Sequence, residues 1–419
     1  MLPLTKPLEN NHSKQAGSSS PHIIPALTAL LIFIGVIIYS NGWASSLEDH
    51  YIHALARGIL PQSVIGSVLQ QAAFRQPDLL PIYGSSEMLN GHSPYRGFIF
   101  FSTYPTGFEV FDIAKGGNTS LNIAQDLAAI GTELKGKKVV ISFTPSSYIA
   151  KEVPDNAYAA NFSRIHAYAL AFSPNLSMPL KQTIAARMLE YPDTLAHDPV
   201  LSFALQNLAR DTFLNSLMYY MVFPLGQLDS FVIRMQDHYA VWDYIHSHPG
   251  ITPSVLRQPV KIDWNALIAK AKALSKADSS SNPYGIDNKT WVQQYHRVLR
   301  IKKSGSSDKL YIANMERSGE WVDLELTLQV LKELGADPVI MSHPINGILY
   351  TASGISTQAQ QAYYSVLQVI CGYYQIPLVD FQEYTKDPLF SIDMDSHTSQ
   401  EGWVIIDRAL DAYYHGIIH

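Results

Sequence analysis

The segment Gly84-Ser85-Ser86-Glu87 carries residues whose types and spacing are suited to chemistry. It follows a short apolar run at residues 79–83 that is typical of a strand, and Met88 and Leu89 suit the first turn of a helix. A corner between strand and helix lifts a hydroxyl to the carboxyl edge of a sheet, where helix-start amides face a developing negative charge. The segment therefore indicates a nucleophilic serine, although a tight turn with two helix-capping serines has the same sequence pattern.

His397 is the histidine whose position suits that serine. It lies in a loop after the last predicted strand, with Asp393 and Asp395 four and two residues before it. A carboxylate this near can accept a hydrogen bond from one imidazole nitrogen and leave the other to take the serine proton. The alternative is a surface histidine beside a solvated acidic pair. No second cluster has metal-ligand spacing, so we expect no metal and no cofactor.

Apolar strands that alternate with helices must bring these residues together. Five strands are predicted, at residues 79–83, 108–112, 138–143, 338–342 and 376–380. Helices are predicted around them at residues 48–75, 121–130, 321–334 and 358–374, and from about residue 402. This alternation predicts an α/β fold with a mostly parallel sheet, whose ligand site lies beyond the carboxyl ends of the strands.

Residues 155–300 interrupt this alternation and predict a helical insertion. Its expected helices are residues 180–189, 200–221, 228–247 and 264–277. The strongly apolar stretch at residues 218–225 is either core of that insertion or a surface that lies on a membrane or on a membrane partner. With 419 residues, 47% hydrophobic, the chain can build a sizeable core. A net charge of −6 without a dense basic run argues against binding to nucleic acid.

The N-terminal segment indicates a membrane anchor. Residues 1–22 are polar, and we expect a disordered cytoplasmic tail there. Residues 23–39 carry no charge, and with their flanks they predict a transmembrane anchor at residues 23–40. Lysines before this run and acids after it place the N-terminus in the cytoplasm and residues 41–419 outside. A cleaved signal peptide is the alternative.

A resemblance connects these motifs. The chain resembles the DltD family of membrane-anchored proteins of teichoic acid D-alanylation, which are SGNH-hydrolase-like, and the similarity covers almost all of it. The resemblance is carried by the order and spacing of several short motifs: the N-terminal anchor, Gly84-Ser85-Ser86-Glu87, Lys115-Gly116-Gly117, Thr144-Pro145, Ser318-Gly319-Glu320 with Asp323-Leu324, Pro344-Ile345-Asn346-Gly347 with Tyr350, and His397 with Gly402-Trp403-Val404.

The resemblance implies roles for these residues. Ser86, two residues after the glycine, matches the nucleophile, and Gly117 matches a donor of an oxyanion-hole amide. Ser146 stands where the family has a glutamine, and Glu87 and Asn346 match oxyanion- or substrate-binding positions. The family's aspartate, three residues before the histidine, is replaced here by Met394. The carboxylate is then Asp395 or Asp393, and the Asp-x-His pattern of related alginate-acetylating proteins favours Asp395.

The function implied by the resemblance is extracytoplasmic serine acyl transfer. The acyl group would be D-alanine, the acceptor teichoic or lipoteichoic acid, and the partner the membrane-bound O-acyltransferase of the pathway. Two alternatives stay open. The same chemistry could act on another envelope polysaccharide, or the chain could be a non-catalytic accessory subunit of the O-acyltransferase.

Overall fold

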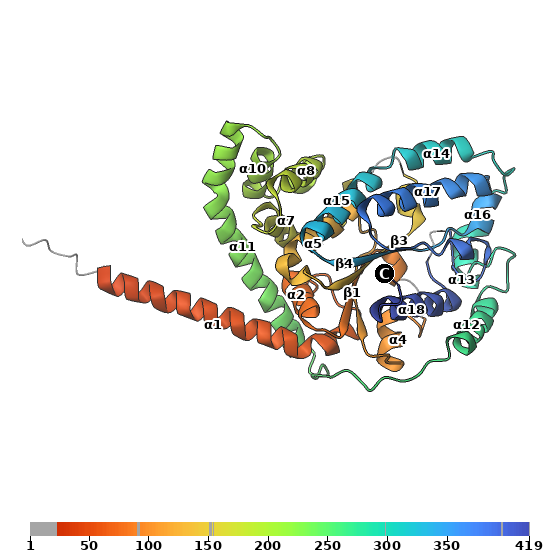
Figure 1. Cartoon of the computed structure of the whole chain (residues 1–419), viewed down its shortest axis with the longest axis horizontal. Helices are drawn as coiled ribbons and strands as arrows, with labels where there is room; N and C mark the ends of the chain where they lie inside the picture. The colour runs from red at the N-terminus through yellow and green to blue at the C-terminus, as the bar shows by residue number, and fades with distance from the viewer. Residues whose placement is uncertain are drawn as a thin grey trace, which may run out of the picture.

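A five-stranded parallel sheet forms the centre of the molecule (Figure 1). The structure is a computed structural model that describes residues 23–89, 93–150, 153, 155–297, 299–394 and 397–418. The strand order is β2-β1-β3-β4-β5. The strands are β1 (Leu79–Gly84), β2 (Glu109–Ala114), β3 (Lys138–Phe143), β4 (Asp337–Ser342) and the short β5 (Leu378–Val379). The predicted α/β class with a mostly parallel sheet is confirmed.

Helices cover both faces of the sheet, and each face has its own apolar cluster. One face carries α2 (Ser67–Arg75), α5 (Ser120–Ile130), α15 (Gly319–Glu333) and α17 (Thr357–Tyr374). The other carries α4 (Gly97–Thr103) and α18 (Gln400–Tyr414), with α12 (Trp264–Asp278) packed on α18. Both layers bury the strands, so their near-continuous apolar sequences are explained by burial on two faces.

The region of the predicted insertion, residues 155–300, is mostly helical. Its helices are α6 (Asp155–Asn161), α7 (Arg164–Ala171), α8 (Met178–Met188), α9 (Pro192–Leu195), α10 (Pro199–Leu208), α11 (Phe213–Ser247), α12, α13 (Asn288–Thr290) and η3 (Trp291–Tyr295). The helix α14 (Asp308–Glu316) and then α15 follow before β4.

Two helix boundaries within this segment differ from the prediction. The helix predicted at residues 200–221 is two helices, because α10 ends at Leu208 and Thr212 caps a new helix by accepting a hydrogen bond from the Asn215 amide. The new helix, α11, then continues through Pro224 to Ser247. Proline removes one backbone donor, but packing of α11 on α7 and α10 keeps the two halves in one helix.

Helix α1 (Ile23–Ala56) projects from the body of the molecule (Figure 1). Among the described residues it is the one helix long and apolar enough to cross a membrane, and its most apolar part is not buried. From Ala44 onward the same helix packs into the core, with Ile52 and Leu55 buried. The predicted helix at residues 48–75 is therefore the end of α1 and the separate helix α2. The predicted tail at residues 1–22 lies outside the described residues.

Candidate active site

The corner after β1 places Ser86 at the carboxyl edge of the sheet. Ser86 is the first residue of the short helix α3 (Ser86–Leu89), so its amide has no acceptor within that helix. Gly84 is required at the corner, because a Cβ there would lie 2.6 Å from Met88 Cγ and 2.8 Å from Glu87 Oε1. Both Ser85 and Ser86 are half-buried, so exposure does not distinguish them.

The contacts of the two serines do distinguish them. The Ser86 hydroxyl lies 3.0 Å from His397 Nε2. The Ser85 hydroxyl instead accepts a hydrogen bond of 3.1 Å from the amide of Asn118, in the loop after β2. Ser86 therefore has the histidine contact that a nucleophile needs, whereas Ser85 fastens the corner to the neighbouring loop.

His397 also contacts a carboxylate. Its Nδ1 pairs with Oδ2 of Asp393, and its backbone amide donates to Asp393 Oδ1 at 3.1 Å. The structure thus brings Ser86, His397 and Asp393 into one chain of contacts, in which the carboxylate orients the imidazole. The sequence pattern favoured Asp395 as the partner; that residue lies outside the described residues, and Asp393 is the carboxylate seen at the ring.

A tight loop allows a residue four positions before the histidine to reach its ring. Ile392 N donates to His397 O at 2.7 Å, and Ser391 and Thr398 form an antiparallel bridge. This hairpin turns Asp393 back toward the imidazole. Asn346 supports the turn, because its Nδ2 donates to the carbonyl of Asp393 at 3.3 Å.

His343 is a further buried histidine of this region that sequence reasoning did not select. It follows β4, and its two ring nitrogens lie 3.2 Å from Ser142 Oγ and 3.0 Å from Thr398 Oγ1. It therefore links the end of β3 to the residue after His397. The available signal was its position directly after a predicted strand that ends at the same edge of the sheet.

The loop after β2 places Gly117 next to the corner. Lys115 N and Asn118 Nδ2 both donate to Gly84 O, at 3.4 and 3.2 Å. Gly117 adopts a φ of +69°, a conformation that favours glycine. Ser146, after β3, pairs its hydroxyl with Thr144 Oγ1 at 2.8 Å. The structure therefore joins the loop of Gly117 to the serine corner, whereas the Ser146 hydroxyl has a partner within its own loop.

Glu87 lies beneath the corner, where it is fully buried. Its Oε1 accepts a hydrogen bond of 2.8 Å from the Ser85 amide. Burial raises the pKa of Glu87 to about 7, and burial also raises the pKa of nearby Asp112 to about 7. Predicted as an oxyanion- or substrate-binding residue, Glu87 here contacts the backbone of the corner and supports its shape.

Glu87→Gln is expected to flatten the dependence of stability on pH. Because the folded-state pKa of Glu87 is raised, its contribution to the free energy of unfolding is fully present below about pH 4.5 and is lost as pH rises through about 7. The change should be on the order of 1–3 kcal/mol. Glutamine keeps the acceptor for Ser85 but does not ionise. Urea unfolding at pH 5 and pH 8 measures the difference, and an unchanged pH dependence in the variant would contradict this account.

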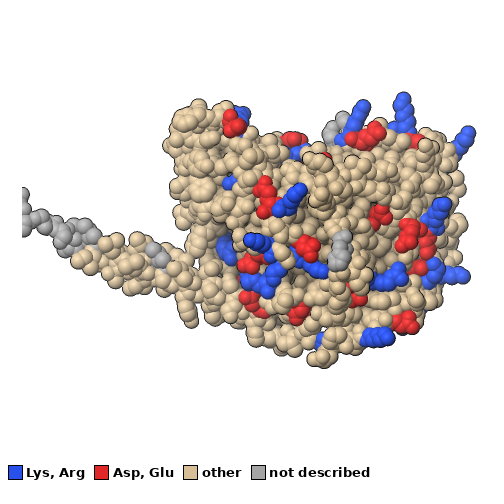
Figure 2. Space-filling view, viewed as in Figure 1, with Lys and Arg blue, Asp and Glu red and all other residues tan. Residues whose placement is uncertain are grey.

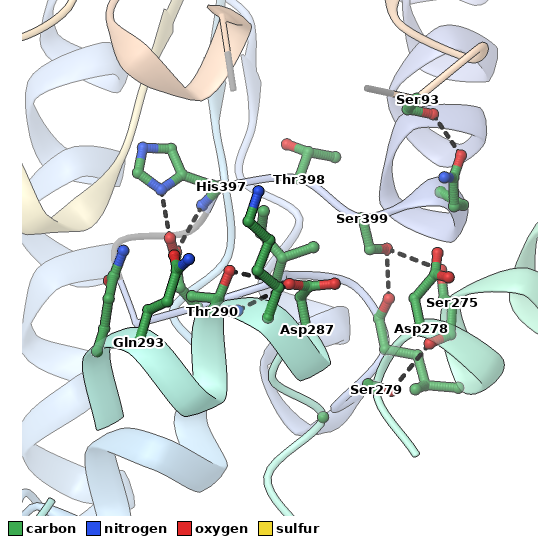
Figure 3. A pocket seen from close by; sticks show the side chains of 17 residues that line it. Ser93, Ser275, Asp278, Ser279, Asp287, Thr290, Gln293, His397, Thr398 and Ser399 are labelled. Carbon is green, nitrogen blue, oxygen red and sulfur yellow. Dashed lines mark hydrogen bonds and ion pairs between the residues drawn. The ribbon is translucent and has the colours of Figure 1, made fainter. Parts of the chain in front are cut away.

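A cavity of about 530 Å³ reaches His397 (Figure 3). His397 and Thr398 lie at one end of it, and Ser275, Ser279 and Ser399 gather at the other. Most of its lining residues carry hydroxyl, amide or carboxylate groups, and they come mainly from α12, α13, η3 and the loop of His397. Such a lining can hydrogen-bond a ligand that carries hydroxyl groups, and its carboxylates, Asp278, Asp287 and Asp393, outnumber the one lysine among the lining side chains, Lys289.

Comparisons with known proteins agree with the motifs of the sequence. Residues 56–415 match the family model described as DltD protein. The chain belongs to the DltD family. A protein named Protein DltD from Bacillus subtilis (strain 168) is 27% identical over 394 residues, which cover 93% of this chain and 96% of the relative. Protein DltD from Staphylococcus aureus (strain NCTC 8325 / PS 47) is 25% identical over 399 residues, 94% of this chain and 96% of the relative. The resemblance to the DltD family is confirmed.

Proposed function

We propose that this protein is a membrane-anchored serine acyltransferase that transfers D-alanyl groups to teichoic or lipoteichoic acid outside the cytoplasm. DltD family proteins act in teichoic acid D-alanylation. The observation that carries the catalytic part of the proposal is the contact chain Ser86–His397–Asp393, because a serine hydroxyl 3.0 Å from an imidazole that also pairs with a carboxylate is equipped for nucleophilic attack.

The reaction proceeds in two steps. In the first, Ser86 Oγ attacks the carbonyl carbon of an ester or thioester donor and His397 Nε2 takes the hydroxyl proton. The donor's alcohol or thiol leaves with that proton, and the acyl group stays on Ser86. In the second, His397 takes the proton of an acceptor hydroxyl, whose oxygen attacks the acyl carbon. The bond from that carbon to Ser86 Oγ then breaks, and His397 gives its proton to Ser86 Oγ. Asp393 stabilises the protonated imidazole in both steps.

Backbone amides stabilise the tetrahedral intermediates. The amide of Ser86 opens α3, and the Gly117 amide belongs to the loop fastened to Gly84. Both are assigned to the oxyanion hole, where loss of one donor typically lowers the rate by about 10²–10³. Ser146, in place of the family's glutamine, leaves these two amides as the principal donors.

The donor reaches the site from the membrane. With the N-terminus in the cytoplasm, α1 spans the bilayer and holds the catalytic domain outside, so the membrane-bound O-acyltransferase of the pathway supplies the acyl group and the polymer receives it. The continuous course of α1 into the core favours an anchor over a cleaved signal peptide, because cleavage near Ala44 would remove part of a packed helix.

The test is the D-alanine ester content of the envelope polymer in cells with and without this gene. Loss of the gene is expected to lower the ester-linked D-alanine of the polymer severalfold, measured by mass spectrometry of the purified polymer. The wild-type gene should restore the D-alanine content. An unchanged D-alanine content with a change in another acyl group would contradict the proposed substrate and support action on another polysaccharide.

A further inference from the structure

Helix α11 exposes a long apolar stripe. Eight large apolar side chains share one exposed face of its first twenty residues, and Phe213, Met221 and Leu228 are 86%, 68% and 57% exposed. The stripe comprises Phe213, Leu214, Leu217, Tyr220, Met221, Leu225, Leu228 and Val232. Spacings of three and four residues place these side chains on one side of the helix over about 30 Å. The opposite side packs on α7 and α10.

The stripe lacks the charged side chains of an ordinary solvent-facing helix. From Phe213 to Leu228 the sequence contains no Asp, Glu, Lys or Arg. Figure 2 shows the part of the surface formed by α8, α10 and α11 as almost entirely uncharged, in contrast to the rest of this face. A continuous apolar patch of this size on a protein in water marks a surface that another phase or molecule covers.

Buried hydrogen bonds fix α11 to the membrane anchor. His238 of α11 has both ring nitrogens engaged with α1: Nδ1 lies 2.6 Å from Glu48 Oε1 and Nε2 lies 2.8 Å from Asn41 Oδ1. His238 and Glu48 are both buried. From this junction the apolar half of α1 and the stripe-bearing half of α11 diverge like the arms of a V that opens away from the sheet (Figure 1). The anchor therefore determines how the stripe faces the bilayer.

We propose that the α11 stripe lies in the interfacial region of the bilayer that α1 spans. The proposal rests on the proposed anchoring by α1. Lipid is the favoured occupant for two reasons. The stripe lies on the side of the molecule from which α1 projects (Figure 1), and it carries no charged side chain that could specify a protein partner. Its apolar side chains would enter the boundary between headgroups and acyl chains, as in other interfacial helices. Two contacts with the bilayer, α1 and α11, then hold the active site in one orientation above the membrane.

The test uses the full chain in phospholipid nanodiscs with single labelled cysteines. Cys371 is buried, and burial raises the pKa of its thiol to about 12, so a maleimide dye should leave it unmodified. An environment-sensitive dye at Leu217→Cys is expected to be quenched by acyl-chain spin-labelled lipid and to be severalfold less sensitive to aqueous iodide than the same dye at Tyr373→Cys. Tyr373 is the matched control, since it is 78% exposed on α17.

A third label separates this proposal from the anchoring on which it rests. Dye at Leu31→Cys, in the apolar half of α1, reports on the anchor alone. If the dye at position 31 is quenched by the spin-labelled lipid while the dye at position 217 behaves as at position 373, α1 is anchored and the stripe proposal is wrong. If the dyes at positions 31 and 217 are both open to iodide and unaffected by the lipid, the anchoring fails and the stripe proposal fails with it.

Discussion

Ser86→Ala is expected to abolish acyl transfer while the protein stays folded. The substitution removes one oxygen atom from a half-buried position, and that oxygen contacts the ring of His397. Without it no acyl-serine can form. Loss of a serine nucleophile elsewhere lowers kcat by about 10⁶, so ester-linked D-alanine in complemented cells should fall to the level of cells without the gene.

Ser85→Ala is the matched control. It removes an identical atom one residue away, and the lost contact is the hydrogen bond from the Asn118 amide. That change should reduce activity only partly, by loosening the loop of Gly117. Circular dichroism and thermal unfolding of both variants verify the fold. Folded Ser86→Ala protein that restores full D-alanylation would overturn the enzymatic account and favour a non-catalytic accessory subunit.

Asp393→Asn is expected to cause the second largest loss. The amide keeps an oxygen for the His397 backbone N–H, but it cannot balance the charge of the imidazolium, and its NH₂ group favours the wrong ring tautomer. The equivalent change in a serine protease triad lowers kcat by about 10⁴. The measurement is the initial rate of hydrolysis of an activated ester by the purified variant, with its unfolding midpoint as a check on stability.

Asp395→Asn provides the comparison for that experiment. If Asp393 orients His397, Asp395→Asn should keep most of the wild-type rate. If Asp395→Asn loses as much activity as Asp393→Asn, or more, Asp395 orients His397, as the Asp-x-His pattern predicts. Wild-type rates in both variants would remove an aspartate from the mechanism.

The sequence predicted the parts of the site that depend on local pattern. An apolar run followed by Gly84 and two serines is recognisable as a strand-to-helix corner, and the late position of His397 follows from the way parallel strands bring their carboxyl ends together. The contact of Asp393 with the His397 ring depends on the backbone pairing of Ile392 with His397, which no local sequence pattern specifies.

The environment of Glu87 was beyond sequence reasoning for a different reason. Its raised pKa follows from complete burial, which is produced by packing between segments distant in the chain. The continuation of α11 through Pro224 also depends on contacts with segments distant in the chain. Pro224 is an ordinary helix breaker in a local reading, but contacts with α7 and α10 stabilise one helix on both sides of it.

The most direct test of the central claim is active-site labelling with a serine-reactive phosphonate, located by mass spectrometry of the digested protein. The account predicts one modified serine, Ser86, in the wild-type protein, and little label in a folded His397→Ala variant, because the base that activates the hydroxyl is lost. Label on Ser85, or a folded wild-type protein in which Ser86 stays unmodified, would contradict it.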